Sequence, residues 1–216
     1  MEPDAPSTFI EPPQPTTTDY LSEWDRVHAT ISTHSAECRR IAAWAELKPG
    51  ARVIDIACGT GQHLLEFARR GHPCFGSDQL WWKIVRAVAL AGAEGLPIKY
   101  ACADLRTLRL RPRYDLVLCL YAMSMMRRDE DLLAALAVAK SALAPGGRFV
   151  FNVLASEGLD ETDQVFQDDH LRTYGPEEIN GYLAQAGLET LRMEKSSIPG
   201  FGSFDLNYVC RKEEAP

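Results

Sequence analysis

The chain has 216 residues, of which 46% are hydrophobic and 25% are charged, as in an ordinary folded globular domain. Its 23 basic and 30 acidic residues give a formal net charge of -7. This charge argues against broad binding to the phosphate backbone of a nucleic acid, because such binding depends on a net electrostatic attraction.

The cysteines and the apolar runs indicate the cellular setting. The chain has six cysteines and no C-x-x-C pair, which disfavours a zinc site and favours reduced thiols in a cytosolic protein. The opening residues MEPDAPSTFI lack the basic start and the apolar block of a signal peptide. The longest mostly apolar run, LVLCLYAMSMM, is too short to cross a bilayer. We therefore expect a cytoplasmic protein with no membrane partner.

The first 47 residues divide into two parts. Residues 1–18 are rich in proline and include a TTT run, a composition that buries little surface and predicts a disordered arm. From residue 19 the pattern becomes helical, with helices expected over 19–32 and 35–47. These helices open a single domain that we expect to span residues 19–216.

Short apolar runs then alternate with amphipathic helices. Strands are predicted over 52–58, 73–78, 98–104, 114–121 and 148–154, and helices over 61–70, 81–94, 129–143 and 175–186. The segments 188–197 and 203–212 read as a closing pair of strands. This alternation predicts a doubly wound, Rossmann-like α/β fold. We expect a seven-stranded sheet that is mostly parallel, with an antiparallel C-terminal strand.

A long polar segment over 155–175 interrupts this alternation. It is acidic and has no clear period, and long loops that follow a central strand often carry function. Its carboxylates either attract a cationic substrate or form a solvated loop. His170 lies in this segment, and we consider it the best candidate for a general base among the five histidines.

A glycine-rich turn, ACGTGQ, follows the first strand and points to a ligand site. Gly59 and Gly61 permit a tight turn and a close approach of the backbone to a ligand. Leu64 occupies the place of the third glycine of a dinucleotide-binding turn. Asp55 puts a negative charge beside the turn, which is the wrong sign for a phosphate. A ligand with an ammonium or sulfonium group fits better.

The next two strands also end in acids. Asp78 follows the second strand, where a carboxylate can accept hydrogen bonds from both hydroxyls of an adenosine ribose. Asp104 follows the third strand, where it can accept from an adenine amino group or cap the next loop. Three acids at the same edge of one parallel sheet favour a shared ligand over three separate caps.

The ordered motifs VIDIACGTG, GSD, CADL, YDLVLCL and LAPGGRFVF resemble those of the class I S-adenosylmethionine-dependent methyltransferases. The resemblance spans about residues 35–154, and a weaker one continues through YGPEEINGYLAQAGLE. The D-x-ACGTG-x-HL form is similar to small-molecule N-methyltransferases that act on amino sugars and glycine-like amines. The resemblance implies S-adenosylmethionine as the cofactor and a small molecule as the substrate.

The resemblance also implies roles for particular residues. Asp55 would order the loop and meet the methionine part of the cofactor, and Asp78 would bind the ribose. Tyr20 and Trp24 would form a lid from the N-terminal helical region over 19–47. The other residues implied in cofactor binding lie in the turn and at the strand ends: Ala57, Gly59, Gly61, Gln79, Ala103, Asp104, Leu105 and Leu120.

The sequence departs from the family after the fourth strand. Many members have a histidine there, whereas this chain has Met125 and Met126, so a base of that kind is missing. Tyr121 remains as a candidate catalytic residue, together with His170. Tyr121 also stands where catechol-type enzymes carry metal-binding acids, so we expect no metal. These features favour methyl transfer to nitrogen, which needs only a neutral amine.

Several alternatives stay open at this stage. One is an oxygen methyltransferase with a histidine or tyrosine base, and another is a catalytically silent partner that keeps the fold. An aminopropyltransferase would use the same fold, and a dinucleotide oxidoreductase is disfavoured by Asp55 and Leu64. Trp81 and Trp82 have two interpretations: one packs on the sheet while the other lies on the surface, or they form an aromatic wall beside the ligand.

Overall fold

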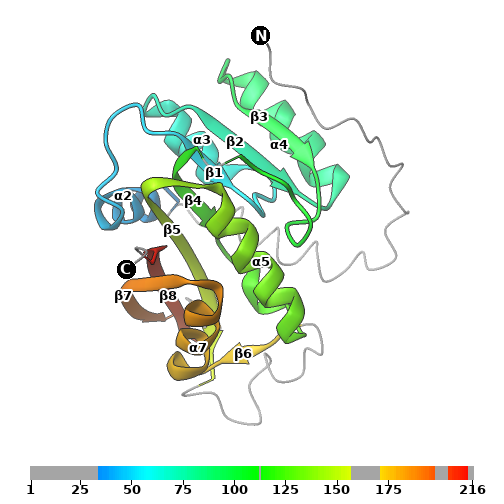
Figure 1. The fold of residues 1–216 in the computed structure, drawn as a ribbon. Coiled ribbons are helices and arrows are strands. Elements are labelled where there is room, and N and C mark those ends of the chain that lie inside the picture. The colour runs from blue at the N-terminus through cyan, green and yellow to red at the C-terminus, as the bar shows by residue number, and fades with distance from the viewer. Residues whose placement is uncertain (1–33, 112, 157–170, 198–203, 214–216) are drawn as a thin grey trace. The chain divides into compact units, whose positions relative to one another are not determined.

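The structure is a computed structural model of the chain, and it describes residues 34–111, 113–156, 171–197 and 204–213 (Figure 1). The expected arm over 1–18 and the expected helix over 19–32 lie outside these residues, as do the candidates Tyr20, Trp24 and His170. The domain boundary at residue 19 therefore stays a prediction.

Helices and strands alternate along most of the described chain. The helices are α2 (His34–Trp44), α3 (Gln62–Arg69), α4 (Trp81–Ala93), η1 (Met123–Met125, a 3₁₀ turn), α5 (Asp129–Ala142) and α7 (Pro176–Ala186). The strands are β1 (Val53–Asp55), β2 (Cys74–Asp78), β3 (Lys99–Cys102), β4 (Tyr114–Cys119), β5 (Leu143–Ala155), β6 (Thr173–Tyr174), β7 (Leu188–Ser197) and β8 (Phe204–Lys212).

Within the described residues the sheet has eight strands, with the order β3-β2-β1-β4-β5-β8-β7 and β6 paired to β5. β1 to β6 pair in parallel, and β8 runs antiparallel to both β5 and β7. This confirms the doubly wound fold and its antiparallel C-terminal strand. The expected number of seven strands omits β6, because two residues within an aperiodic segment leave no pattern to detect.

Helices cover both faces of the sheet, so the strands are buried on two sides (Figure 1). Alternate residues of a strand point to opposite faces, and β4 divides its side chains in this way. Val117 and Cys119 pack in the core that contains α5 and α7, whereas Leu116 and Leu118 pack in the core of α2, α3 and α4. Both cores position the carboxyl ends of β1, β2 and β4 at one edge of the sheet. None of the described helices combines the length and apolar character that a membrane crossing requires.

The ends of α7 match the signals in its sequence. Pro176 occupies the first turn, where the missing N–H of proline costs no helical hydrogen bond. Gly187 follows the helix with a φ of 66°, a left-handed conformation that closes a helix at little cost when the residue is glycine. This helix carries Ile179 and Leu183 into the core beneath β5 and β8.

Candidate functional site

The loop between β1 and α3 turns at two glycines beside the carboxyl edge of the sheet. Gly59 and Gly61 have φ values of 54° and 82°, in the region that favours glycine. A Cβ atom on Gly61 would lie 2.6 Å from the hydroxyl oxygen of Tyr100, so this position has no room for a side chain. Apart from its two chain neighbours, no described residue has an atom within 4 Å of a Cβ placed on Gly59. A ligand can therefore approach the backbone closely at Gly59.

Asp55 ends β1 beneath this loop and is almost fully buried, with 2% of its surface exposed. Its Oδ1 accepts a hydrogen bond from the Ala57 N–H at 3.1 Å. Burial raises the pKa of Asp55 to about 7, although the charge of His63 and the Ala57 N–H favour the carboxylate. The nearby negative charge of Asp78 adds to the rise. A cationic ligand beside Asp55 would therefore stabilise its charged form.

Asp78 ends β2 and connects the glycine loop to the start of α4. Its Oδ2 accepts from the Gly59 N–H and its Oδ1 accepts from the Leu80 N–H, both at 2.9 Å. The carboxylate therefore helps to hold the loop in its tight conformation. Its predicted contact with a ribose stays a prediction, and removing this side chain would also disturb the loop.

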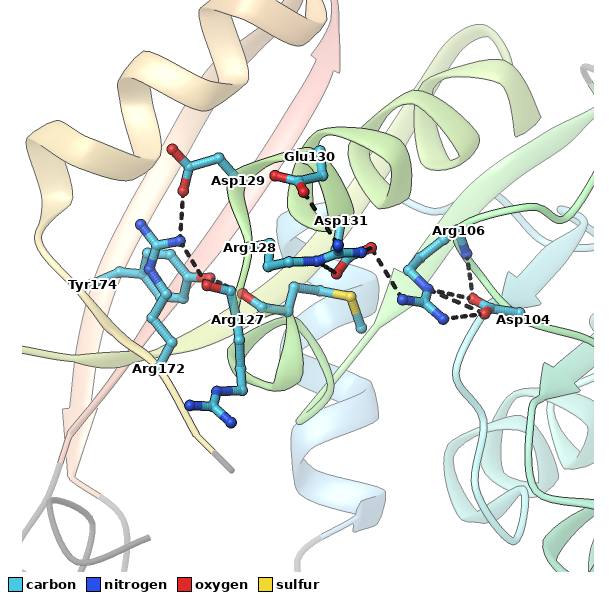
Figure 2. A network of polar contacts seen from close by, with 10 residues as sticks. Asp104, Arg106, Arg127, Arg128, Asp129, Glu130, Asp131, Arg172 and Tyr174 are labelled. Carbon is cyan, nitrogen blue, oxygen red and sulfur yellow. Dashed lines mark hydrogen bonds and ion pairs between the residues drawn. The ribbon is translucent and has the colours of Figure 1, made fainter. Parts of the chain in front are cut away.

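Asp104 follows β3 and forms a dense set of contacts with Arg106 (Figure 2). Its Oδ1 accepts the Arg106 N–H at 2.9 Å, so the side chain caps the loop, as one of the two sequence interpretations proposed. Hydrogen bonds from the Arg106 side chain lower the pKa of Asp104 and outweigh the effect of burial. The alternative role, as an acceptor for an adenine amino group, stays a prediction.

The other residues predicted to bind the cofactor lie around these three acids. Ala103 donates its N–H to the Asp78 carbonyl oxygen at 3.0 Å, and this bond ties the ends of β2 and β3 together. Gln79 is exposed beside Asp78. Leu105 and Leu120 are buried, the latter next to the end of β4. The structure thus brings these predicted residues to the carboxyl ends of β1 to β4.

A second polar cluster joins three elements and was not predicted from the sequence. Glu37 of α2 accepts the Tyr121 hydroxyl hydrogen on Oε1 at 2.7 Å, and its Oε2 lies 2.9 Å from Nε2 of His63. The rings of His63 and Tyr121 stack with their centroids 6.3 Å apart. The side chains of His63 and Glu37 are only 10% and 12% exposed. The one local signal was His63 within the ACGTG-x-HL motif.

The pKa shifts indicate that this cluster holds an ion pair. Burial opposes the charge on Glu37, but the hydrogen bond and the charge of His63 lower the pKa of Glu37 to about 2. Burial likewise opposes the charge on His63, but the hydrogen bond and the charge of Glu37 raise the pKa of the imidazole. Burial and the charge of Glu37 raise the pKa of Tyr121 well above its usual range. The cluster therefore holds a carboxylate, an imidazolium and a neutral phenol.

Tyr121 follows β4 with a left-handed backbone, an uncommon conformation for a residue with a bulky side chain. Its φ is 58°, and its N–H donates to Oδ1 of Asn152 at 2.6 Å. Asn152 is 2% exposed and belongs to β5. Backbone strain of this kind persists where the surroundings over-determine it, often at functional sites. Two hydrogen bonds from different elements therefore fix the orientation of Tyr121 at the end of β4.

The described end of the 155–175 segment is firmly held. Arg172 donates to Asp129 at 2.7 Å, and its guanidinium lies 4.8 Å from the centre of the Tyr174 ring (Figure 2). It also donates to Glu178 at 2.6 Å. Its N–H donates to the Ser124 carbonyl oxygen at 2.7 Å. These contacts anchor β6 beside the start of α5. The part of the segment that contains His170 is outside the described residues.

The two tryptophans after β2 do not divide as the first of the two interpretations expected. Trp81 and Trp82 are 41% and 37% exposed, so neither is buried against the sheet. Both belong to the first turn of α4, whose buried side faces inward through Ile84 and Ala87. The turn of the helix directs the tryptophans away from that buried side.

S-adenosylmethionine, the cofactor that the sequence resemblance implies, fits the charges of this site. It carries a sulfonium and an ammonium group, and the site offers the buried carboxylate of Asp55 beside a loop that a ligand can approach closely at Gly59. Within the described residues, no group of three or more histidine, cysteine or acidic side chains is arranged to hold a metal ion.

Comparisons with known proteins agree on the family. The methyltransferase domain family matches residues 29–192, which is more than half of the chain. A ubiquinone biosynthesis O-methyltransferase of Rhodopseudomonas palustris strain BisB18 is 29% identical over 70% of this chain, and the match spans 65% of that relative, just under two thirds of its length.

Solved structures show the same fold. A S-adenosylmethionine-dependent methyltransferase from Clostridium acetobutylicum superimposes with a TM-score of 0.74 at 18% identity, over 90% of this chain and 98% of that one. The 1,6-didemethyltoxoflavin-N1-methyltransferase of Burkholderia thailandensis was solved with bound S-adenosylhomocysteine. It superimposes with a TM-score of 0.71 at 18% identity, over 95% of this chain and 94% of that one. With the family match and the predicted motifs, these findings lead to one conclusion: the chain belongs to the class I S-adenosylmethionine-dependent methyltransferases.

Proposed function

We propose that this enzyme transfers the methyl group of S-adenosylmethionine to a small molecule whose acceptor atom needs no enzyme base, most simply a neutral amine. The observation that carries the choice of acceptor is the Glu37–His63–Tyr121 cluster. It lies at the end of β4, where the family would place a base, and both oxygens of its carboxylate are already engaged by Tyr121 and His63.

The protonation states of the side chains in this cluster support this choice. A general base must be unprotonated and within reach of the proton it removes. The Tyr121 hydroxyl already donates to Glu37, and its raised pKa disfavours the phenolate. The imidazole of His63 is held in its charged form by Glu37, so it also cannot accept a proton. Tyr121 is therefore better suited to orient a substrate than to deprotonate it.

The remaining residues would bind and align the reactants. When bound, the cofactor supplies an activated methyl group on a sulfonium centre. Asp55 would balance its positive charge, Gly59 would let the loop approach it, and Asp78 would hold its ribose. Alignment of two reactants can supply roughly 7–11 kcal/mol of the barrier in a well-oriented pair. We propose that such alignment dominates catalysis and that no metal takes part.

Oxygen is the second candidate acceptor, and two observations favour it. The relative in Rhodopseudomonas palustris is named as an O-methyltransferase. In this chain, Asp205 of β8 is 6% exposed, and burial raises its pKa to about 7 despite a hydrogen bond with Asn152. Because Asn152 also holds Tyr121, Asp205 belongs to the same neighbourhood and is the best described candidate for a base on a hydroxyl substrate.

The net charge of -7 supports a small molecule over a nucleic acid as the substrate. The six cysteines all carry free thiols in the structure, which supports a reducing compartment such as the cytoplasm.

Methyl transfer to paired acceptors tests the proposal. The full chain is incubated with labelled S-adenosylmethionine and with amines or phenols of matched shape, in the presence and absence of a chelator. We expect transfer to amines with no loss in chelator. Transfer to phenols alone, with loss of activity in Asp205→Asn, would favour the second candidate. Binding of S-adenosylmethionine without transfer to any acceptor would favour a silent partner.

A further inference from the structure

Among the described residues, every hydrogen bond that the carboxylate of Asp104 accepts comes from Arg106. Oδ1 accepts from the Arg106 backbone N–H at 2.9 Å and from Nε at 3.0 Å. Oδ2 accepts from Nε at 3.0 Å and from Nη2. An ionised carboxylate has about four acceptor positions in total. Three hydrogens of Arg106 therefore engage this carboxylate through four contacts, and a new donor must compete with them for its two oxygens.

Arg106 has a second carboxylate within reach. Its Nη1 donates to Oδ1 of Asp131 at 3.0 Å, and Asp131 lies in the first turn of α5 (Figure 2). Asp131 is itself held by Arg128, whose Nε and Nη2 donate to it at 2.9 and 3.1 Å. The guanidinium thus lies between two acids that belong to different elements. It can turn away from Asp104 and keep an ionic partner.

Because the Arg106–Asp104 ion pair is partly exposed, replacing a guanidinium contact requires little free energy. The side chains of Arg106 and Asp104 are 37% and 30% exposed. Ion pairs with this much access to water contribute little net stability, because water and salt screen them. A ligand donor that reaches Asp104 can therefore replace a guanidinium contact without unfolding the loop. The backbone N–H of Arg106 keeps its own bond to Oδ1.

We propose that Arg106 sets cofactor specificity by competing with the 6-amino group of the cofactor's adenine for Asp104, while Asp131 retains Arg106 when that group displaces it. This inference rests on the proposed role of Asp104 at the adenine end of the S-adenosylmethionine site. It makes Arg106 a positioning residue, because it acts through Asp104.

The test compares two ligands that differ at one atom of the base. S-adenosylhomocysteine has the 6-amino donor, and S-inosylhomocysteine has an oxygen acceptor there, to which Arg106 can donate. Calorimetry gives the ratio of the two dissociation constants for the wild type, Arg106→Gln and the control Arg109→Gln. Arg109 is an exposed arginine of the same loop, so its substitution changes the charge equally.

We expect Arg106→Gln to bind S-adenosylhomocysteine more tightly and S-inosylhomocysteine more weakly. The ratio of the two dissociation constants should therefore widen by about fivefold, the scale of one exposed ion pair. The control should leave the ratio unchanged. Added salt should tighten S-adenosylhomocysteine binding to the wild type but not to Arg106→Gln. A ratio that is unchanged or narrower in Arg106→Gln, or one that widens equally in the control, overturns the inference.

Asp131→Asn supplies an independent test. Without its second carboxylate, Arg106 should stay on Asp104 and weaken S-adenosylhomocysteine binding, and this effect should vanish when Arg106→Gln is already present. An effect of Asp131→Asn that persists in the double variant contradicts the exchange. Failure of the wild type to bind S-adenosylhomocysteine would refute the proposed function and this inference together. Binding with an unchanged ratio would refute the inference alone.

Discussion

Tyr121 donates its hydroxyl hydrogen to Glu37 across 2.7 Å, although 84 positions separate the two residues in the sequence. This bond fixes the end of β4 to α2, and the second carboxylate oxygen of Glu37 continues the contact to His63 on α3. Three elements that surround the glycine loop thus share one buried ion pair. Its charges make the stability of the fold depend on pH.

The ionisation of Glu37 should stabilise the fold above about pH 4.5. Its pKa is about 2 in the folded chain and 4.5 ordinarily, so its contribution is complete above 4.5 and disappears as the pH falls toward 2. The difference corresponds to about 3 kcal/mol in the free energy of unfolding. Urea denaturation between pH 2 and 5 should show this loss in the wild type and a much flatter profile in Glu37→Gln.

The same experiment at higher pH tests His63. Its folded pKa is raised above 6.5, so its contribution is complete below that pH and is lost as the pH rises through the folded value. Glu37→Gln should remove this loss as well. Parallel profiles for the variant and the wild type would show that the pair carries no ionic stabilisation.

Tyr121→Phe should lower turnover by about tenfold to a hundredfold, because the phenol orients the substrate and does not remove a proton. The pH profile of turnover should keep its shape, since the variant removes no titrating base. Steady-state kinetics at saturating substrate provide the measurement. A loss greater than about ten-thousandfold, or a profile that loses one limb, would identify Tyr121 as the base and favour an oxygen acceptor.

Alanine substitutions at the two loop glycines should differ in cost. Gly59→Ala meets only the strain of a positive φ, about 1–2 kcal/mol, because no described residue beyond its chain neighbours lies within 4 Å of the new Cβ atom. Gly61→Ala adds a clash with the Tyr100 hydroxyl oxygen at 2.6 Å and should cost roughly 1–3 kcal/mol more.

Tyr100→Phe provides the matched control for this pair. It removes the clashing oxygen, which is buried and has no hydrogen-bond partner among the described residues, so it should cost little by itself. It should restore part of the stability of Gly61→Ala and none of that of Gly59→Ala. Thermal denaturation of the three single variants and of the two double variants with Tyr100→Phe provides the measurement. Equal rescue of both glycine variants would exclude the clash as the cause.

Asp78→Ala should weaken cofactor binding by roughly 1.5–3 kcal/mol, the range for hydrogen bonds to a charged group. Part of this loss comes from the loop, since Asp78 also accepts the Gly59 and Leu80 N–H groups. Calorimetry with S-adenosylhomocysteine and its 2′,3′-dideoxy analogue separates the two effects. If both ligands lose the same affinity, the residue supports the loop but does not contact the ribose.

Removal of residues 1–18 should leave the melting temperature and the cofactor affinity nearly unchanged, because their composition buries little surface. Differential scanning fluorimetry and calorimetry of the shortened and full chains provide the comparison. A drop of several degrees would show that the segment contributes to the packed structure.

The elements with strong local patterns could be predicted well from the sequence. The helix expected over 129–143 is α5, Asp129–Ala142, and the strand expected over 73–78 is β2, Cys74–Asp78. β5 begins earlier than expected, at Leu143, because that residue pairs with Tyr114 before the register shifts. Such a pairing depends on another strand and leaves no trace in the local period.

The same distinction between local pattern and tertiary contact separates the site residues that could be predicted from those that could not. The positions of Asp55, Asp78 and Asp104 could be predicted because each ends or closely follows a strand of one parallel sheet, and this topology brings strand ends together. Glu37 could not, because α2 shows only a helical stripe and gives no indication of what its polar side meets. Arg106 was overlooked although it lies two residues from Asp104, since a neighbouring arginine on a loop is usually solvated.

The position of β8 has a consequence for biosynthesis. β8 lies between β5 and β7 in the sheet, yet it leaves the ribosome after both of them. Until residue 212 has emerged, the edge of β5 opposite β4, which β8 covers from Phe149 to Leu154, has no partner strand among the described residues. From the synthesis of β5 until β8 has emerged, the nascent chain therefore exposes an open apolar strand edge, and chaperones that cover such edges can act on the chain during this interval.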